Sequence, residues 1–121
     1  MLVMKKQSIC LVGLGYVGLP LAVSFAKFYN IVGFDINFLR IKELSDGHDR
    51  TLEIESKLLK SVKDNITYTS NIQDAKNCNI YIVTVPTPID NTNRPDLKPL
   101  VESSKTIGTV LSKGDIVIYE S

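Results

Sequence analysis

Residues 7–18 read Gln-Ser-Ile-Cys-Leu-Val-Gly-Leu-Gly-Tyr-Val-Gly, and residues 31–35 read Ile-Val-Gly-Phe-Asp. The first stretch begins as an apolar run that predicts a buried strand, and it continues directly into Gly-x-Gly-x-x-Gly. The residues between the two stretches have a helical pattern, and the second apolar run ends in the acid Asp35. Strand, glycine turn, helix, strand and acid in this order predict the first unit of a dinucleotide-binding fold.

Each glycine of the turn has a separate physical role in such a fold. Gly13 permits the tight turn from strand to helix, Gly15 lets the backbone approach a pyrophosphate, and Gly18 lets the helix pack closely on the strand. The pyrophosphate then lies on the unpaired N–H groups at the helix N-terminus, where the helix dipole favours negative charge. We expect Asp35 to accept hydrogen bonds from both hydroxyls of the adenosine ribose.

The residues around Asp35 favour NAD over NADP. The carboxylate of Asp35 would repel the 2′-phosphate of NADP, and Ile36 and Asn37 stand where an NADP site often has a basic residue. Arg40 weakens this argument, because a guanidinium could bind a phosphate. Two interpretations of Arg40 stay open: a solvated helix residue, or a residue that lines the adenosine pocket.

Strand and helix patterns alternate along the whole chain. Strands are expected at residues 7–12, 30–35, 66–69, 80–85 and 116–119, and helices at residues 16–29, between Asn37 as cap and Gly47, at 53–63, at 71–77 and after Asp96 as cap. Spacing places Val17, Leu21, Phe25 and Phe28 on the buried face of the first helix, and Leu97, Leu100, Ser104, Ile107, Val110 and Leu111 on that of the last.

This alternation predicts an α/β fold with a doubly wound, parallel, Rossmann-like sheet in the strand order 3-2-1-4-5. Pro86 and Pro88 end the fourth strand and force an extended loop through residue 95. No helix pattern follows the last strand, which predicts that residues 1–121 are an NAD-binding domain truncated at its C-terminal end.

Composition excludes several classes of function. The chain has 121 residues, 44% hydrophobic and 22% charged, with a formal net charge of +1, which indicates one ordinary domain and no nucleic-acid or membrane-surface partner. No apolar run approaches the roughly 18 residues that span a bilayer, and residues 1–6 lack a signal-peptide core, so we expect a cytoplasmic protein. Cys10 and Cys78 fit no metal spacing, so we expect two buried small hydrophobes and no metal.

Four stretches together resemble the N-terminal domain of the UDP-glucose/GDP-mannose dehydrogenase family. They are Gly-Leu-Gly-Tyr-Val-Gly-Leu-Pro-Leu-Ala at 13–22, Phe-Asp-Ile-Asn at 34–37 with Arg40-Ile41, Val-Thr-Val-Pro-Thr-Pro at 83–88, and Gly-Asp-Ile-Val-Ile-Tyr-Glu-Ser at 114–121. Gly-His-Asp-Arg-Thr-Leu-Glu at 47–53 resembles the branch that oxidises UDP-N-acetylhexosamines in surface-polysaccharide pathways. The UDP-glucose branch tends to be rich in proline there.

The resemblance implies oxidation of a sugar C6 alcohol to a carboxylate, with two NAD molecules reduced and a covalent intermediate on a cysteine. It places Tyr16 and Val17 against the pyrophosphate, Asp35 and Arg40 at the adenosine, and Pro86 and Thr87 beside the cofactor.

The catalytic cysteine, lysine and asparagine of the family belong to segments that this chain does not contain, and Cys10 and Cys78 do not match that cysteine. We therefore expect no catalytic residue here and no activity from these residues alone. For the complete protein we expect a UDP-sugar substrate and a homo-oligomer.

Simpler roles stand beside these implied ones. Tyr16 could pack on the helix, and Thr84 and Thr87 could satisfy strand-end carbonyls instead of contacting the cofactor. We interpret His48 and Asp49 as an ordinary polar turn, and Glu120 as an exposed charge at a strand end.

Alternative functions are a UDP-glucose 6-dehydrogenase, a β-hydroxyacid or hydroxyacyl-CoA dehydrogenase, and a module that senses NAD or NADH without chemistry. A methyltransferase also uses a glycine turn and an acid after the second strand. The Val-Thr-Val-Pro-Thr-Pro loop at 83–88 argues against the hydroxyacyl-CoA class, and the strand spacing argues against a methyltransferase.

Overall fold

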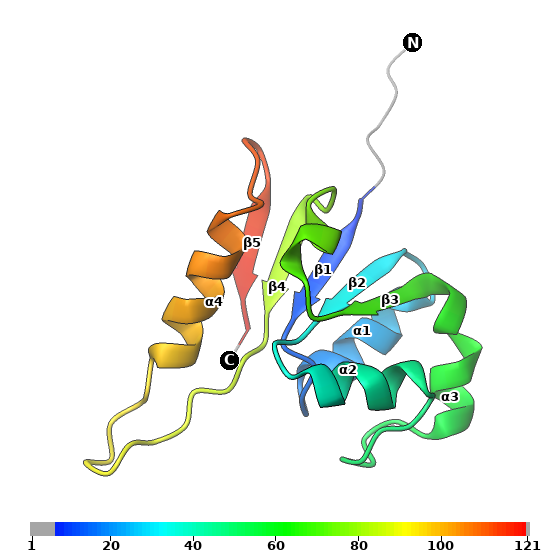
Figure 1. Ribbon diagram of the computed structural model, residues 1–121, viewed down its shortest axis with the longest axis horizontal. Helices are drawn as coiled ribbons and strands as arrows, with labels where there is room; N and C mark the ends of the chain where they lie inside the picture. Colours follow the sequence, from blue (N-terminus) through cyan, green and yellow to red (C-terminus); the bar gives the residue numbers. More distant parts are fainter. Residues whose placement is uncertain (1–6, 121) are drawn as a thin grey trace.

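The central sheet of the computed structural model, which describes residues 7–120, has five strands in the order β3-β2-β1-β4-β5 (Figure 1). The strands are β1 (Ile9–Val12), β2 (Ile31–Phe34), β3 (Ile66–Thr69), β4 (Ile80–Val83) and β5 (Ile116–Tyr119). All four pairings are parallel, and Ile9 of β1 is in register with Ile31 of β2 and Ile80 of β4. The expected fold class and strand order are confirmed.

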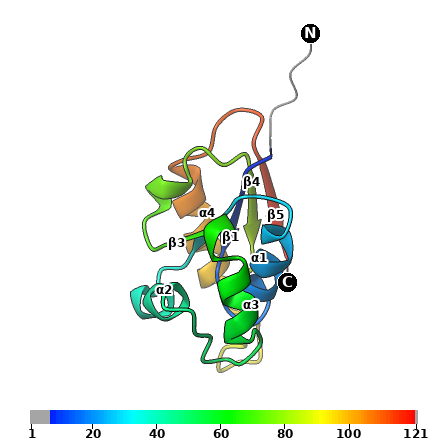
Figure 2. The same ribbon diagram turned by 90° about the vertical axis from the view of Figure 1, so that its right-hand side faces the viewer.

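Four α-helices and two short 3-10 turns connect the strands, and they lie on both sides of the sheet (Figure 2). The helices are α1 (Gly18–Ala26), α2 (Phe38–Ser45), α3 (Ser56–Ser61) and α4 (Lys98–Gly108), and the turns are η1 (Lys63–Asn65) and η2 (Ile72–Ala75). Because helices cover both faces, the central strands are continuous apolar runs rather than alternating ones.

Two hydrophobic cores form, one on each face of the sheet. Side chains of α1, α2 and α3 pack in the first core against alternate residues of β1, including Ile9 and Leu11. Side chains of η2 and α4 pack in the second core against the other residues of β1, Cys10 and Val12. The period of two along β1 therefore divides the strand between the cores.

Helix α1 is shorter than expected, and its predicted buried face is confirmed only for two of its four residues. It spans Gly18–Ala26 instead of residues 16–29, and Phe28 lies beyond it with 80% of its surface exposed. Val17 is also exposed, whereas Leu21 and Phe25 are partly buried. The residues buried against the sheet are Gly18, Leu19, Ala22, Val23 and Ala26. The small residues Gly18, Ala22 and Ala26 share this face with the larger Leu19 and Val23.

Helix α2 begins as the sequence predicts, because the Asn37 side chain accepts hydrogen bonds from the N–H groups of Leu39 and Arg40. The other helices are shorter than predicted: α3 has six residues rather than spanning 53–63, and residues 71–77 contain only the turn η2. The predicted inner face of the last helix is confirmed in part: Ile107 and Val110 are buried and Leu100 packs against the core. Leu97 and Leu111 are exposed instead.

None of the helices within residues 7–120 is long and apolar enough to cross a membrane. Over the same residues, no group of three or more histidine, cysteine or acidic side chains is placed to hold a metal ion.

Gly18 provides a test of the close contact between α1 and the glycine turn. A Cβ at this position would overlap the Gly13 carbonyl oxygen and the Thr84 hydroxyl. We expect Gly18→Ala to lower the free energy of unfolding by about 2–4 kcal/mol, measured by urea denaturation. Gly108→Ala is the matched control, because a Cβ there meets open space at the end of α4 and should change stability by no more than about 1 kcal/mol. Equal effects of the two changes would contradict this account.

Candidate functional site

A cleft of about 530 Å³ lies at the carboxyl ends of the strands. Its walls come from the turn after β1, the end of β2, the end of β4 and the first turns of α4. The chain continues from β1 to β2 on one side, and β4 later pairs with the other side of β1. The cleft therefore lies where the strand order reverses. Ligands of open α/β sheets bind at this location. The lining residues are Val12, Gly13, Leu14, Gly15, Phe34, Asp35, Ile36, Thr84, Val85, Pro86, Asp96, Lys98, Pro99, Glu102, Ser103 and Thr106.

The glycine turn presents bare backbone to this cleft. Gly13 has a φ of +103°, which favours glycine, and no atom lies within 4 Å of the position that a Cβ on Gly15 would occupy. Within the described part of the chain, the N–H groups of Gly15, Tyr16 and Val17 have no hydrogen-bond acceptor. Tyr16 is 68% exposed and so does not pack on the helix. Three free donors at a helix N-terminus fit a phosphate group.

Four hydrogen bonds hold the preceding two residues of the turn. The Gly13 N–H donates to Phe34 O (2.8 Å), and the Thr84 hydroxyl donates to Gly13 O (2.7 Å). The Leu14 N–H donates to Asp35 Oδ2 (2.9 Å), and Arg40 Nε donates to Leu14 O (2.8 Å). The turn is therefore fixed from β2, α2 and β4 before any ligand arrives. One of the two readings of Thr84 is confirmed: it satisfies strand-end carbonyls.

Asp35 lies at the end of β2 and lines the cleft. Its Oδ2 accepts from Leu14 N, and its Oδ1 accepts from Asn37 N at 2.9 Å. Each oxygen of an ionised carboxylate has a second lone-pair site, so both can accept one more hydrogen bond. Asp35 thus fits the two hydroxyls of a ribose while it holds the turn.

One interpretation of the sequence made Arg40 a solvated helix residue, and the structure contradicts it. Only 6% of it is exposed, and the residues that line the cleft do not include it. Its Nη1 donates to Glu43 Oε1 (2.9 Å) and to Asp49 Oδ1 (2.8 Å), while its Nε holds Leu14 O. Burial alone would lower the pKa of Arg40, but its bonds to Glu43 and Asp49 raise it above the usual value. Arg40 is a buried cation beneath the turn.

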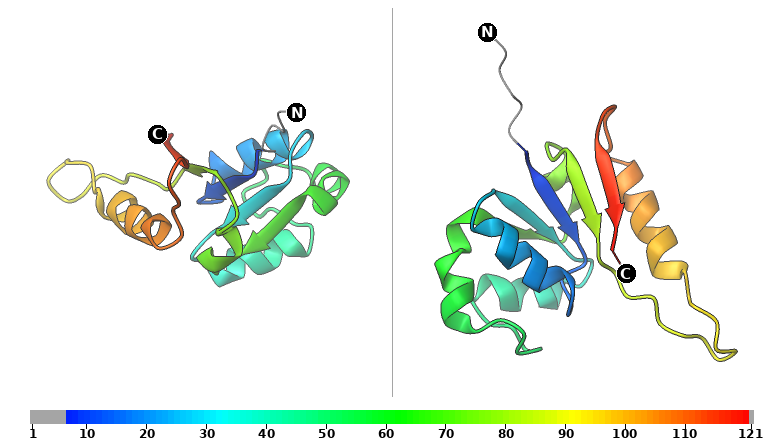
Figure 3. Two further views of the ribbon diagram at one scale, coloured as in Figure 1. Left: turned by 90° about the horizontal axis from the view of Figure 1, so that it is seen from above. Right: turned by 180° about the vertical axis from the view of Figure 1, so that it is seen from behind.

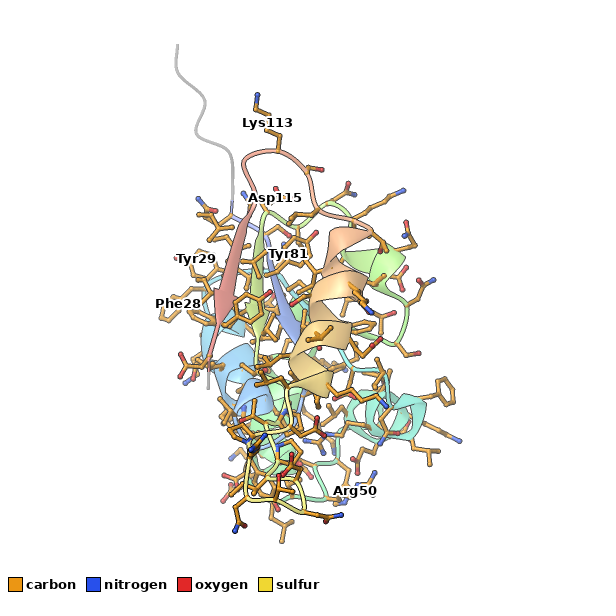
Figure 4. All side chains as sticks on the ribbon, turned by 90° about the vertical axis from the view of Figure 1, so that its left-hand side faces the viewer. Phe28, Tyr29, Arg50, Tyr81, Lys113 and Asp115 are labelled. Atoms are coloured by element: carbon orange, nitrogen blue, oxygen red, sulfur yellow. The ribbon has the colours of Figure 1, made fainter. Side chains whose placement is uncertain are left out.

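Asp49 is not part of an ordinary polar turn, and that prediction was wrong. It is 1% exposed, and it accepts hydrogen bonds from Arg40, from both the N–H and the hydroxyl of Thr51, and from the N–H groups of Glu53 and Ile54. Burial alone would raise its pKa, but the bonds from Thr51, Arg40 and the backbone outweigh burial and lower the pKa to about 2. Its neighbour Arg50 extends outward at the end of the molecule where the strands finish, opposite Lys113 (Figure 4).

The loop between β4 and α4 carries the remaining predicted residues. Pro86 lines the cleft, whereas Thr87 is exposed on the loop, which extends past α4 (Figure 3). A single bridge pairs Ile89 with Pro95, and Asp90 Oδ1 accepts from the N–H groups of Thr92 and Arg94 at the tip. Ser121, the last residue of the stretch 114–121, lies outside the described residues.

Helix α4 contributes a wall of the cleft that the sequence analysis did not predict. Lys98, Glu102, Ser103 and Thr106 line the cleft from one side of the helix. The signal was present: a helix that follows a strand-end loop begins at the carboxyl edge of the sheet, and residues three to four apart share a face.

The two cysteines lie in environments that do not favour a nucleophile. Cys10 and Cys78 are both buried, as expected, and burial raises the pKa of both thiols above the usual value. Since the thiolate is the reactive form, burial and the raised pKa disfavour reaction of both thiols at neutral pH.

Residues 7–121 match the model for the UDP-glucose/GDP-mannose dehydrogenase family, NAD binding domain. The chain belongs to this family. It is 58% identical over 118 residues to the UDP-N-acetyl-D-glucosamine 6-dehydrogenase of Pseudomonas aeruginosa, covering 98% of this chain and 28% of that protein. It is 51% identical to Protein CapL of Staphylococcus aureus, covering 96% of this chain and 27% of CapL.

The solved structure of UDP-D-ManNAc dehydrogenase from Pyrococcus horikoshii superposes with a TM-score of 0.90 at 35% identity, covering 95% of this chain and 28% of that chain. The family assignment confirms the expected resemblance, and NAD is the cofactor of this domain family. The chain spans 27–28% of the length of these relatives.

The low pKa of Asp49 predicts how acid affects stability. Because the folded pKa is about 2 and the usual value is 3.8, ionised Asp49 stabilises the fold above pH 3.8, and this stabilisation is lost as the pH falls toward 2. We expect Asp49→Asn to be less stable than the unmodified chain at neutral pH, with a difference that shrinks as the pH falls from 3.8 to 2. Urea denaturation at several pH values measures it. Glu53→Gln, an exposed change in the same loop, serves as control, and a constant difference for Asp49→Asn would refute the assignment.

Proposed function

We propose that this chain is the NAD-binding domain of a nucleotide-sugar 6-dehydrogenase that oxidises the C6 alcohol of a UDP-N-acetylhexosamine to a uronate. The observation that carries the proposal is a single cleft in which free N–H groups of the glycine turn lie near Asp35. The identity of 58% to a UDP-N-acetyl-D-glucosamine 6-dehydrogenase, and the stretch at 47–53, support the choice of sugar.

The residues of the cleft fit NAD part by part. The N–H groups of Gly15, Tyr16 and Val17 would hold the pyrophosphate, and Gly13 and Gly18 would keep the turn close to β4. Asp35 would accept the ribose hydroxyls. When bound, NAD supplies the hydride acceptor of the oxidation.

We propose positions around the cofactor for the other predicted residues. Pro86 and Thr87 would lie beside the cofactor, one in the cleft wall and one on the adjoining loop. Arg40 would serve the adenosine end indirectly, since it holds the Leu14 carbonyl from beneath the turn. We assign the catalytic groups to the remainder of a longer protein, because the two thiols of the described residues are buried and their pKa is raised.

For the complete protein we propose a homo-oligomer in the cytoplasm, in surface-polysaccharide biosynthesis, without nucleic-acid or membrane partners. The near-neutral net charge of +1 supports the absence of a charged surface for binding nucleic acid or membrane.

Cofactor binding by the 121-residue chain tests the first half of the proposal. Titration of the isotope-labelled chain with NAD, followed by NMR, should shift the amide signals of Gly15, Tyr16 and Val17. We expect Asp35→Ala to weaken binding by about tenfold or more, because two charge-assisted hydrogen bonds to the ribose are lost. Asp64→Asn, a change at the exposed η1 turn, should leave affinity unchanged. Shifts confined to other residues would contradict the proposed site.

Substrate oxidation by the complete protein tests the second half. We expect NADH formation with UDP-N-acetylglucosamine or UDP-N-acetylgalactosamine, and much less with UDP-glucose or UDP-N-acetylmannosamine, measured by absorbance. The 121-residue chain alone should form no NADH. NADH formation with UDP-glucose only would favour the other branch of the family. A protein that binds NAD but oxidises none of the four sugars would instead indicate a sensing module.

A further inference from the structure

Arg40 and Asp35 both form hydrogen bonds with the backbone of Leu14 in the glycine turn. Asp35 accepts from the N–H of Leu14, and Arg40 donates to its carbonyl oxygen. A guanidinium and the acid that would meet the adenosine ribose are therefore both bonded to Leu14. Guanidinium groups bind phosphates tightly, so a free Arg40 at this position would favour a cofactor with a phosphate on that ribose.

Arg40 is not free, because two acids neutralise it. Its Nη1 lies 2.8 Å from Asp49 Oδ1 and 2.9 Å from Glu43 Oε1, and Glu43 is shared with Arg50 on the surface at 3.0 Å. Arg50 thus matches the charge of Glu43, and Asp49 matches that of Arg40. Asp49 is the better-buried partner, with no exposed side-chain surface against 16% for Glu43.

Asp49 is also fixed in place. The N–H groups of Thr51, Glu53 and Ile54 and the Thr51 hydroxyl all donate to its carboxylate. The carboxylate therefore cannot swing away and leave the cation exposed. A buried cation that loses its anchored partner is strongly destabilised where it is, so removal of Asp49 should drive Arg40 toward solvent or toward the cleft.

The Arg40 side chain has little else to hold it. Its second terminal nitrogen, Nη2, is buried and has no hydrogen-bond partner among the described residues. Without Asp49, the guanidinium keeps only the Leu14 carbonyl and the carboxylate of Glu43, which is partly exposed.

We propose that Asp49 is a specificity-determining residue that makes this site select NAD over NADP. By binding and neutralising Arg40 beneath Leu14, it leaves Asp35 as the uncompensated charge at the ribose end of the cleft. Asp49 does not line the cleft and acts only through Arg40. The inference rests on the proposed NAD site, and it gives the stretch 47–53 a role in cofactor choice.

The test compares dissociation constants of the 121-residue chain for NAD and NADP, measured by NMR titration. We expect Asp49→Asn to lower the ratio of the NADP constant to the NAD constant by about fivefold, because the charge of Arg40 is no longer cancelled. The asparagine retains an oxygen for Arg40 and Thr51, which favours folding. Should it not fold, Glu43→Gln removes the second acid and should shift the ratio in the same direction, by less.

Two controls separate specificity from structure. Glu55→Gln removes the same charge from an exposed residue of the same loop and should leave the ratio unchanged. Adding Arg40→Gln to Asp49→Asn should abolish the gain for NADP. If Asp49→Asn and Glu43→Gln weaken both cofactors equally, Asp49 is only structural and the inference fails while the NAD site stands. If the unmodified chain binds neither cofactor, the proposed function fails, and the inference fails with it.

Discussion

The shape of the site depends on one peptide unit and its neighbour, the N–H and the carbonyl of Leu14. Asp35 at the end of β2 accepts from the N–H, and Arg40 of α2 donates to the carbonyl. Both side chains belong to the unit that follows the turn in sequence. The turn after β1 therefore takes its final form only when β2 and α2 have docked, which makes the ligand-facing N–H groups a product of tertiary structure as much as of the glycines.

The side chain of the same residue ties the turn to the hydrophobic core. Leu14 is completely buried and packs over Gly33 of β2, where a Cβ would come within 3.2 Å of a Leu14 methyl group and 3.3 Å of the Tyr68 ring. A side chain at Gly33 would push Leu14 outward and move the turn with it. Core packing and cofactor geometry are thus set by the same contacts, which explains why the strand IVGF has a glycine in an otherwise bulky run.

The strands and their order could be predicted because buried parallel strands are short apolar runs, and because right-handed connections leave few topologies. The buried face of α1 could be predicted only in part. The spacing that joins Leu21 and Phe25 continues to Phe28, and periodicity did not show that the helix ends at Ala26, before Phe28. Asp49 was missed for another reason. A polar turn and a buried ion pair have the same composition, and only the fold brings Asp49 to Arg40 and to the backbone of residues 51–54. Capping by Asn37 was predictable since it is local.

Cys10 and Cys78 are sealed in the core on the α4 side of the sheet, in contact with a different set of elements from those that hold the glycine turn. A thiol reagent can reach them only when that core opens. Their labelling rate therefore reports the opening equilibrium of the η2 and α4 half of the molecule, without any engineered probe. Hydrogen exchange of the Leu14 amide reports opening of the glycine turn. The two measurements together therefore distinguish opening of the cofactor turn from opening of the second core.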